Sequence, residues 1–287
     1  MNQLSYERPT SLAEAQHALS KPGARPLAGG TDLIVQLRES RREADVLVDL
    51  KHVVELREIS ETADGGLSVG PSVSATDLLR DGRIPERYPA LAVSLGMIGS
   101  RQIQNRGTLG GNVCNAAPSA DAVPPLICYG AQCHLTGPSG ARTIAIEELF
   151  KGPGRTNLAE GEILARIELP PQPAKSAAHY IRFTPRREMD IAVVGSGAWI
   201  ALDSANTITA ARIALASVAP TPIRSSSAEA ALLNQPASNE TFAKAAIAAK
   251  DDVTPISDTR GSADYRKSLV ETLTRRALEA CASQIQS

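Results

Sequence analysis

Aromatic residues are scarce in this chain, at 3% of its 287 residues, and its formal net charge at pH 7 is only −1. Nucleic-acid-binding proteins usually carry basic patches and aromatic rings on which bases stack, so these two shortages argue against a nucleic-acid partner. The sequence also lacks an apolar run long enough for a membrane span or a secretory signal, which makes the cytoplasm the expected location. Its 43% hydrophobic and 21% charged residues are typical of a globular protein with room for two or three domains.

Metal-binding and catalytic patterns are missing as well. The four cysteines form no CxxC pair, and neither they nor the four histidines have the spacing of a zinc site or a disulfide framework. The cysteines are Cys114, Cys128, Cys133 and Cys281. No Ser-His-Asp set or pair of carboxylates stands out either, so we expect no metal ligand and no catalytic residue in this chain. An enzymatic role would therefore need a cofactor to carry the chemistry.

The sequence does contain a glycine pair within Thr108–Asp121, which reads TLGGNVCNAAPSAD. Gly110 and Gly111 allow a sharp turn whose backbone N–H groups point outward, an arrangement that suits a phosphate. The run 119–121 (SAD) precedes an apolar stretch at 122–129 and so has the signature of a capped helix start. The simpler interpretation is an ordinary turn before a helix, and this stretch alone does not decide between the two.

A second stretch, residues 26–38, follows the same plan. Ala28–Asp32 reads AGGTD and leads into a helical apolar pattern. Two glycine-rich turns, each ending at a helix N-terminus, could together hold a diphosphate. Capping is the simpler explanation of Asp32 and Asp121, but in a nucleotide-binding protein such a carboxylate would reach a ribose hydroxyl or an adenine edge. The mixed charges of residues 182–190 are most simply a solvated strand end.

The order of predicted elements divides the chain into three parts. Residues 1–52 are expected to form a small α/β lobe and residues 53–173 a larger one, with a Pro-rich boundary at 170–173. Residues 174–287 combine three long strands with three helices, which predicts an α+β domain with a three-stranded antiparallel sheet and a small helical bundle. The strands are expected at 178–183, 190–202 and 207–218, and the helices at 227–234, 239–250 and 262–283.

These motifs together resemble one known family. Ala28–Asp32, Thr108–Asn112 and Arg186–Ala192 (RREMDIA) are similar to segments of the FAD-binding medium subunit of molybdenum hydroxylases, the group that includes carbon monoxide dehydrogenase and xanthine dehydrogenase. The resemblance covers essentially the whole chain. It implies a two-lobed FAD-binding domain of the vanillyl-alcohol-oxidase/p-cresol-methylhydroxylase type, with the diphosphate between the lobes and a C-terminal domain that covers the flavin.

The resemblance also implies which residues hold FAD. The two glycine motifs would contact the diphosphate and the ribityl chain, Asp121 the adenosine ribose or adenine, and Leu164 the adenine side. Arg182 would supply a cation near the flavin, and Met189 and Ile191 would lie near the isoalloxazine ring. The full implied set is Ala28, Gly29, Gly30, Thr31, Asp32, Ile98, Thr108, Gly110, Gly111, Asn112, Asp121, Leu164, Arg182, Met189 and Ile191. No histidine lies in either glycine motif, so we expect the FAD to be bound non-covalently.

As the resemblance implies, the chain would relay electrons through FAD to an external acceptor. The electrons would come from [2Fe–2S] clusters on a small subunit, fed by a molybdenum cofactor on a large subunit, and a dimer of such heterotrimers is expected. Ile191 stands where the carbon monoxide enzymes have an aromatic residue, which weakens that substrate assignment. Two alternatives stay open, namely a self-sufficient FAD-dependent oxidoreductase of the same fold and a non-catalytic nucleotide-binding scaffold subunit.

Overall fold

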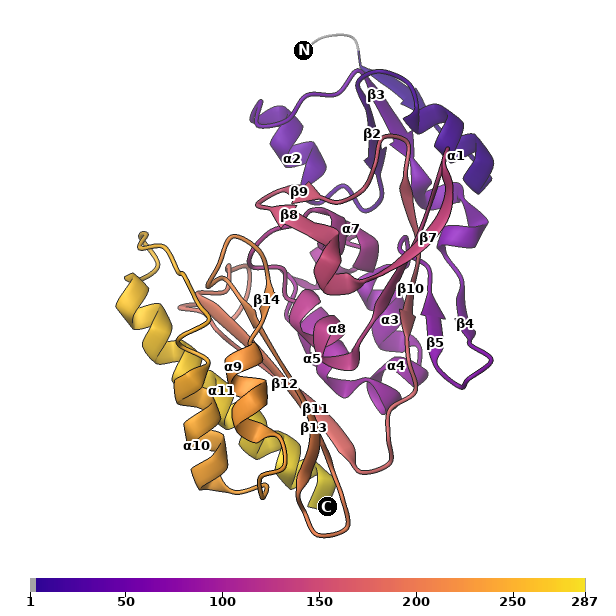
Figure 1. Cartoon of the computed structure of the whole chain (residues 1–287). Helices are drawn as coiled ribbons and strands as arrows, with labels where there is room; N and C mark the ends of the chain where they lie inside the picture. The colour runs from indigo at the N-terminus through magenta and orange to yellow at the C-terminus, as the bar shows by residue number, and fades with distance from the viewer. Residues whose placement is uncertain (1–3, 287) are drawn as a thin grey trace.

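The computed structural model describes residues 4–286, and its first part is a small lobe built on a parallel sheet (Figure 1). The strands lie in the order β1-β3-β2, with β1 at Ser5–Glu7, β2 at Ala24–Leu27 and β3 at Val46–Asp49. Helix α1 (Leu12–Leu19) and helix α2 (Leu33–Arg38) connect them. The Ser11 side chain caps α1 by accepting from the Glu14 N–H, and α1 buries Ala15 and Ala18 against the sheet.

The second part is a lobe with a five-stranded antiparallel sheet in the order β4-β5-β10-β6-β7. Its strands are β4 (Ile59–Glu61), β5 (Leu67–Val69), β6 (Gln132–Gly137), β7 (Gly140–Ala145) and β10 (Ile163–Leu169). Its helices are α3 (Ala75–Arg80), α4 (Arg83–Arg87), α5 (Pro89–Gly96), α6 (Arg101–Gln104), α7 (Leu109–Cys114) and α8 (Val123–Tyr129). Short 3₁₀ segments lie at Leu50–His52, Val54–Leu56 and Ile146–Leu149, and a small hairpin joins β8 (Phe150–Gly152) to β9 (Arg155–Thr156).

The third part has the predicted three long antiparallel strands and three helices. The strands are β11 (Ser176–Phe183), β12 (Val194–Leu202) and β13 (Ile208–Ala216), with a two-residue edge strand β14 (Ile223–Arg224). The helices are α9 (Ser226–Leu232), α10 (Asn239–Ala248) and α11 (Ala263–Gln286). The strand expected to begin at residue 190 begins only at Val194, because residues 184–193 form a loop that turns at Met189, whose φ is +53°.

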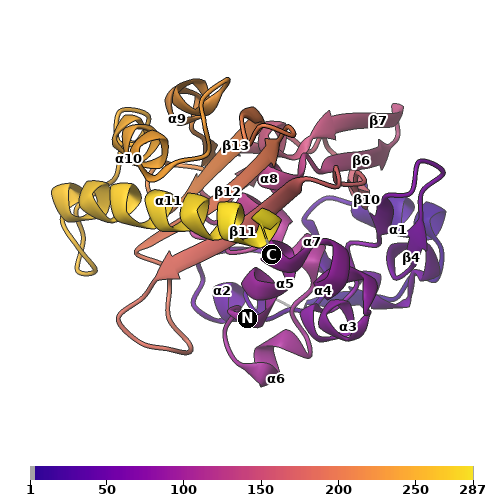
Figure 2. The same ribbon diagram turned by 90° about the horizontal axis from the view of Figure 1, so that it is seen from below.

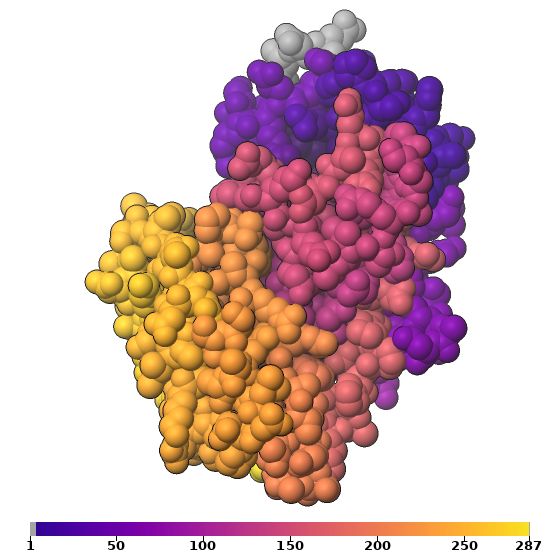
Figure 3. Space-filling model, in the orientation of Figure 1, coloured from indigo at the N-terminus to yellow at the C-terminus, as the bar shows by residue number. Residues whose placement is uncertain are grey.

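The third sheet is buried on both faces, which fixes the third part against the second. Helices α5 and α8 pack on one face and α11 on the other, as Figures 1 and 2 show. Along β12, Trp199 enters the core shared with the second lobe, whereas Ile200 enters the core formed with the C-terminal helices. A strand covered on both faces needs apolar or small residues throughout, and β12 reads VGSGAWIAL with every position buried. Figure 3 shows the resulting block of orange and yellow residues beside the middle lobe.

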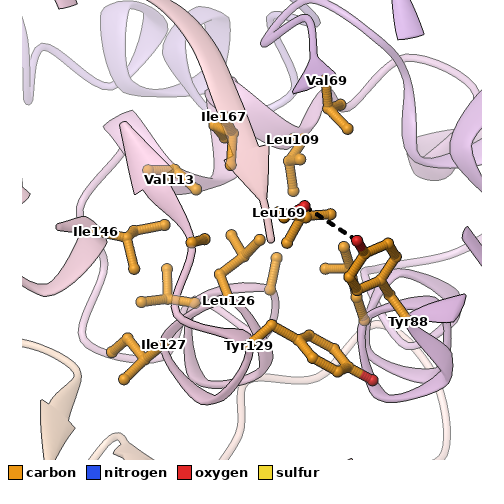
Figure 4. Packing of buried hydrophobic residues seen from close by; sticks show 14 of the residues in the cluster. Val69, Tyr88, Leu109, Val113, Leu126, Ile127, Tyr129, Ile146, Ile167 and Leu169 are labelled. Carbon is orange, nitrogen blue, oxygen red and sulfur yellow. Dashed lines mark hydrogen bonds between the residues drawn. The ribbon is translucent and has the colours of Figure 1, made fainter. Parts of the chain in front are cut away.

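The largest core joins the second sheet to its helices (Figure 4). Leu126 of α8, Val113 of α7 and Ile167 of β10 lie in this cluster together with the rings of Tyr88 and Tyr129. The two rings meet edge to face with centroids 5.2 Å apart. Within residues 4–286, no helix is both long and apolar enough to cross a membrane.

Replacing Tyr88 by Phe should destabilise the second lobe. The buried Tyr88 hydroxyl donates to the carbonyls of Leu169 and Pro170, both at 3.0 Å. The Pro170 carbonyl would keep the Gln172 side chain as a donor at 2.7 Å, whereas the Leu169 carbonyl would lose its bond from Tyr88. We expect a loss of about 1–3 kcal/mol in the free energy of unfolding, measured as a lower urea midpoint. Tyr265→Phe is the matched control, because the Tyr265 side chain is 43% exposed and should tolerate the change. Equal midpoints for the two variants would contradict the prediction.

Candidate cofactor-binding site

A cavity of about 990 Å³ lies between the first two lobes and reaches the loop 184–193 of the third part. Every residue of the expected FAD-binding set except Arg182 lines it. The lining members are Ala28, Gly29, Gly30, Thr31, Asp32, Ile98, Thr108, Gly110, Gly111, Asn112, Asp121, Leu164, Met189 and Ile191. The fold therefore brings together, in one cavity, residues as far apart in the sequence as Ala28 and Ile191.

The first glycine turn, residues 28–32, connects β2 to α2 and presents free backbone donors. Across the described residues, the N–H groups of positions 29–33 have no hydrogen-bond acceptor in the protein. Gly30 adopts φ = +77°, a left-handed conformation that glycine favours. A Cβ on Gly29 would overlap the carbonyl oxygen of Arg106, so only glycine lets this turn rest on the chain just before Thr108. Consecutive unsatisfied N–H groups of this kind suit a phosphate.

Asp32 does not act as the predicted cap. It occupies the N-cap position of α2, but its backbone is helical and its side chain accepts no hydrogen bond from the first turn. A capping side chain needs the extended backbone that Ser11 has at the start of α1, and Asp32 lacks it. The Asp32 side chain is instead exposed and borders the cavity.

The second glycine motif differs from the prediction of an open turn. Thr108 is the N-cap of α7, and Gly110 and Gly111 lie inside the helix. The N–H groups of residues 109–112 are all satisfied by the protein: that of Leu109 by the Val73 carbonyl at 3.1 Å, that of Gly110 by the Pro71 carbonyl at 2.8 Å, and those of Gly111 and Asn112 by Thr108 at 3.0 Å. This motif therefore provides no row of free donors.

The glycines of α7 act through their small size. A Cβ on Gly110 would overlap Pro71, whereas a Cβ on Gly111 would lie 2.9 Å from the Thr108 hydroxyl. Because these two glycines have no side chains, helix α7 packs directly on Pro71 and does not fill this side of the cavity. The Asn112 side chain accepts from the Ala122 N–H at 3.3 Å, which joins α7 to the start of α8.

Asp121 also has a different role from the predicted helix cap. Helix α8 begins after Ala122 without a side-chain cap, and Asp121 points instead to the third sheet. Its Oδ1 accepts from the Tyr180 hydroxyl at 2.7 Å and its Oδ2 from the Arg182 guanidinium at 2.6 Å. Both charged side chains are buried, with 4% of Arg182 and 10% of Asp121 exposed. This pair explains why Arg182 does not line the cavity, since its guanidinium is taken up by the wall.

The surroundings of Tyr180, Asp121 and Arg182 keep the Tyr180 hydroxyl protonated, so it acts as a hydrogen-bond donor. Burial raises the pKa of the Tyr180 hydroxyl well above its usual value, and the neighbouring Asp121 carboxylate raises it further. Burial raises the pKa of Asp121, while Arg182 and the Tyr180 hydroxyl oppose that shift. The cluster fastens β11 to the residues beside the cavity.

The loop 184–193 forms the remaining wall. The Met189 N–H donates to the Gly99 carbonyl at 3.2 Å, so the loop tip is tied to the turn that carries Ile98. Asp190 accepts from the N–H groups of Arg186 at 3.1 Å and Ile191 at 2.9 Å. Met189 and Ile191 are exposed, as expected for a solvated strand end, and both also line the cavity.

Several lining residues carried no signal in the sequence. Arg42, Lys151 and Arg155 bring positive charge to the cavity from the chain after α2 and from the β8–β9 hairpin. Gln36 donates to the Asn115 side chain at 3.2 Å and so links α2 to the end of α7. No periodicity or spacing could have identified them, because only the tertiary fold brings their segments to the cavity.

The cavity fits a large nucleotide cofactor better than a self-contained catalytic centre. Its free N–H groups, glycine-lined walls and surrounding cations suit a diphosphate. Among the described residues, no group of three His, Cys, Asp or Glu side chains could hold a metal ion. The Cys114 thiol borders the cavity, but burial raises its pKa to about 12, so it is not a nucleophile at neutral pH.

The comparisons with known proteins agree with this geometry. Residues 2–172 match the family model of the FAD-binding domain in molybdopterin dehydrogenase, and residues 179–281 match that of the carbon monoxide dehydrogenase flavoprotein C-terminal domain. The fold and the cavity thus define a flavin-binding oxidoreductase subunit. The chain belongs to the family of FAD-binding medium subunits of molybdenum hydroxylases, which confirms the resemblance found in the sequence.

Individual relatives match over nearly the whole chain. A xanthine dehydrogenase FAD-binding subunit of Escherichia coli is 36% identical over 96% of this chain and 94% of its own length. The carbon monoxide dehydrogenase medium chain of Hydrogenophaga pseudoflava is 32% identical over 96% of each chain. A solved structure of the carbon monoxide dehydrogenase from the same organism superposes with a TM-score of 0.93, covering 98% of this chain and 97% of that one.

Replacing Gly110 by Ala should destabilise the fold directly. The added methyl would overlap Pro71, so helix α7 must move away from residues 71–73, at a cost of about 1–3 kcal/mol. Gly96→Ala is the matched control, because a Cβ on this helical glycine meets nothing within 4 Å. We expect a lower urea midpoint for Gly110→Ala and an unchanged or slightly higher one for Gly96→Ala. A Gly110→Ala chain of wild-type stability would show that the packing against Pro71 is not tight.

Proposed function

We propose that the cavity holds FAD non-covalently, with its diphosphate against the turn 28–32. The observation that carries this proposal is the set of free N–H groups at positions 29–33, beside glycines that leave room for close approach. The cations Arg42, Lys151 and Arg155 support it by making the surroundings favourable for an anion. Neither glycine turn contains a histidine to which a flavin could be attached.

The family resemblance supplies the remaining contacts, and the residues that would make them line the cavity. Leu164 would pack on the adenine side, whereas Ile98, Met189 and Ile191 would border the isoalloxazine ring. Asp121 would accept from the adenosine ribose or adenine. Its carboxylate already accepts from Tyr180 and Arg182, but an ionised carboxylate has further lone pairs available. Arg182 would place its positive charge behind Asp121 rather than directly on the flavin.

The proposed role is electron relay within a larger enzyme. When bound, FAD supplies the ability to take up electrons singly or in pairs and to pass them on. The residues of this chain bind the cofactor, orient it and leave an opening for an acceptor. We infer a large subunit with a molybdenum cofactor and a small subunit with [2Fe–2S] clusters as partners, in a cytoplasmic dimer of heterotrimers. The relatives named as medium chains support such partners.

Two alternatives are less well supported. A self-sufficient FAD enzyme would need its own acid or base, yet the buried carboxylates of the cavity, Asp121 and Glu162, are held in ion pairs with Arg182 and Arg142. A non-catalytic scaffold that binds a nucleotide could also use the free donors of the first glycine turn, but the relatives of this chain are FAD-binding subunits of dehydrogenases.

Replacing Thr31 by Val tests the placement of the diphosphate. The Thr31 hydroxyl has only a 3.5 Å contact with the Asp32 carboxylate, so its loss should not change the stability of the FAD-free chain. Loss of one hydrogen bond to a charged group should weaken FAD binding about 10- to 100-fold. Fluorescence titration of the FAD-free chain gives the Kd. The control is Thr272→Val, because Thr272 is similarly half-buried but lies on α11 away from the cavity. Equal Kd values for the two variants would contradict the placement.

Purification from the native source tests the relay. We expect this chain to co-purify with a large and a small subunit, to carry a flavin spectrum, and to be accompanied by molybdenum and iron in metal analysis. Full dehydrogenase activity of the isolated chain would instead identify a self-sufficient enzyme. A colourless chain that cannot be reconstituted with FAD would favour the scaffold.

A further inference from the structure

Arg266 is a buried charge that lies outside the cavity and has no part in the proposed cofactor contacts. It stands in the first half of α11 and is 3% exposed. Its Nη1 donates to the carbonyls of Val193 at 2.6 Å and Ser217 at 3.1 Å, and its Nη2 donates to the Asp258 carboxylate at 2.8 Å. Burying an unpaired guanidinium costs free energy, and the hydrogen bonds to these three acceptors offset that cost for Arg266.

The first acceptor belongs to the loop that forms one wall of the cavity. Val193 is the last residue of the loop 184–193, and its N–H donates to the Phe183 carbonyl at 2.9 Å. The loop tip is held separately, by the bond from Met189 to Gly99. Arg266 therefore fixes the end of the loop just two residues after Ile191, which borders the cavity.

The second acceptor, the Ser217 carbonyl, connects Arg266 to another segment that lines the cavity. Ser217 adopts φ = +66°, an uncommon conformation for a residue other than glycine. Its N–H donates to the Pro118 carbonyl at 2.7 Å, and Pro118 lies between the lining residues Ala117 and Ser119. An uncommon backbone conformation persists only where surrounding contacts hold it. Here the hydrogen bonds from Ser217 to Pro118 and from Arg266 to Ser217 hold the positive φ of Ser217.

We infer that Arg266 is a positioning residue that braces two walls of the flavin cavity from behind. One guanidinium nitrogen holds both the loop 184–193 and, through Ser217, the segment 117–121. Asp258 holds that guanidinium in place and balances its charge. The brace sets where Ile191 and Asp121 stand relative to each other and so controls the fit of the flavin. The inference rests on the proposed binding of FAD in this cavity.

The test compares the full-length Arg266→Met chain with Arg275→Met. Arg275 lies on the same helix in an exposed ion pair with Glu279, so its replacement controls for loss of an arginine from α11. We expect Arg266→Met to raise the FAD Kd at least about tenfold, as loss of buried charge-assisted bonds should. We also expect it to shift the visible spectrum of the bound flavin, whereas Arg275→Met should match the wild type in both. Thermal midpoints are measured alongside.

A merely structural role gives a different result. In that case Arg266→Met lowers the thermal midpoint but leaves the FAD Kd and flavin spectrum unchanged, which overturns the inference. If Arg266→Met does not fold, the same measurements are made on Asp258→Asn and Arg266→Lys. Both retain most of the packing, and wild-type Kd and spectrum in both would overturn the brace. A wild-type chain that cannot take up FAD would overturn the proposed function and the inference together, whereas normal FAD uptake with unaffected variants overturns the inference alone.

Discussion

The structure depends on one close contact between the two lobes, where the first glycine turn rests on the chain that precedes α7. Gly29 lies against the Arg106 carbonyl so tightly that no side chain fits between them. This contact makes one cavity out of two motifs that are far apart in the sequence. It also keeps residues 29–33, whose N–H groups are free, on the same cavity that α7 lines. Any residue larger than glycine would separate the lobes at the point where the cofactor must be held.

Much of this architecture could be predicted from local patterns. The first glycine turn and the three long strands followed by three helices in the C-terminal part depend on residues near each other in the chain, and the structure contains both features. The middle long strand was predictable because β12 is apolar or small at every position, as a strand buried on both faces must be. The composition of the cavity came from the family resemblance, since periodicity could not show that Leu164 and Met189 share one hollow.

What the sequence could not show was the partner of each polar group. The glycine pair at 110–111 has the same local signature as that at 29–30, yet its N–H groups are satisfied by Pro71 and Thr108. Asp121 has the signature of a helix cap, but the third sheet offers it a buried tyrosine and a buried arginine. In both cases the hydrogen-bond partner comes from a distant part of the chain, so the local sequence could not indicate it. Arg266 is the extreme case, because all its acceptors lie outside its own helix.

From these observations we expect the residues most sensitive to substitution to be those that fix distances within the chain. If a bound flavin carries the electrons, no side chain has to exchange a proton with an organic substrate, and the burden on the protein is to hold two lobes and a covering domain at fixed separations. Glycines at contact points and buried donors such as Tyr180 do this. The third sheet meets the second lobe on one face and the C-terminal helices on the other, so a single sheet lies between α11 and the second lobe. If Arg266 acts as inferred above, the C-terminal helices help to shape the cavity although none of their described residues lines it.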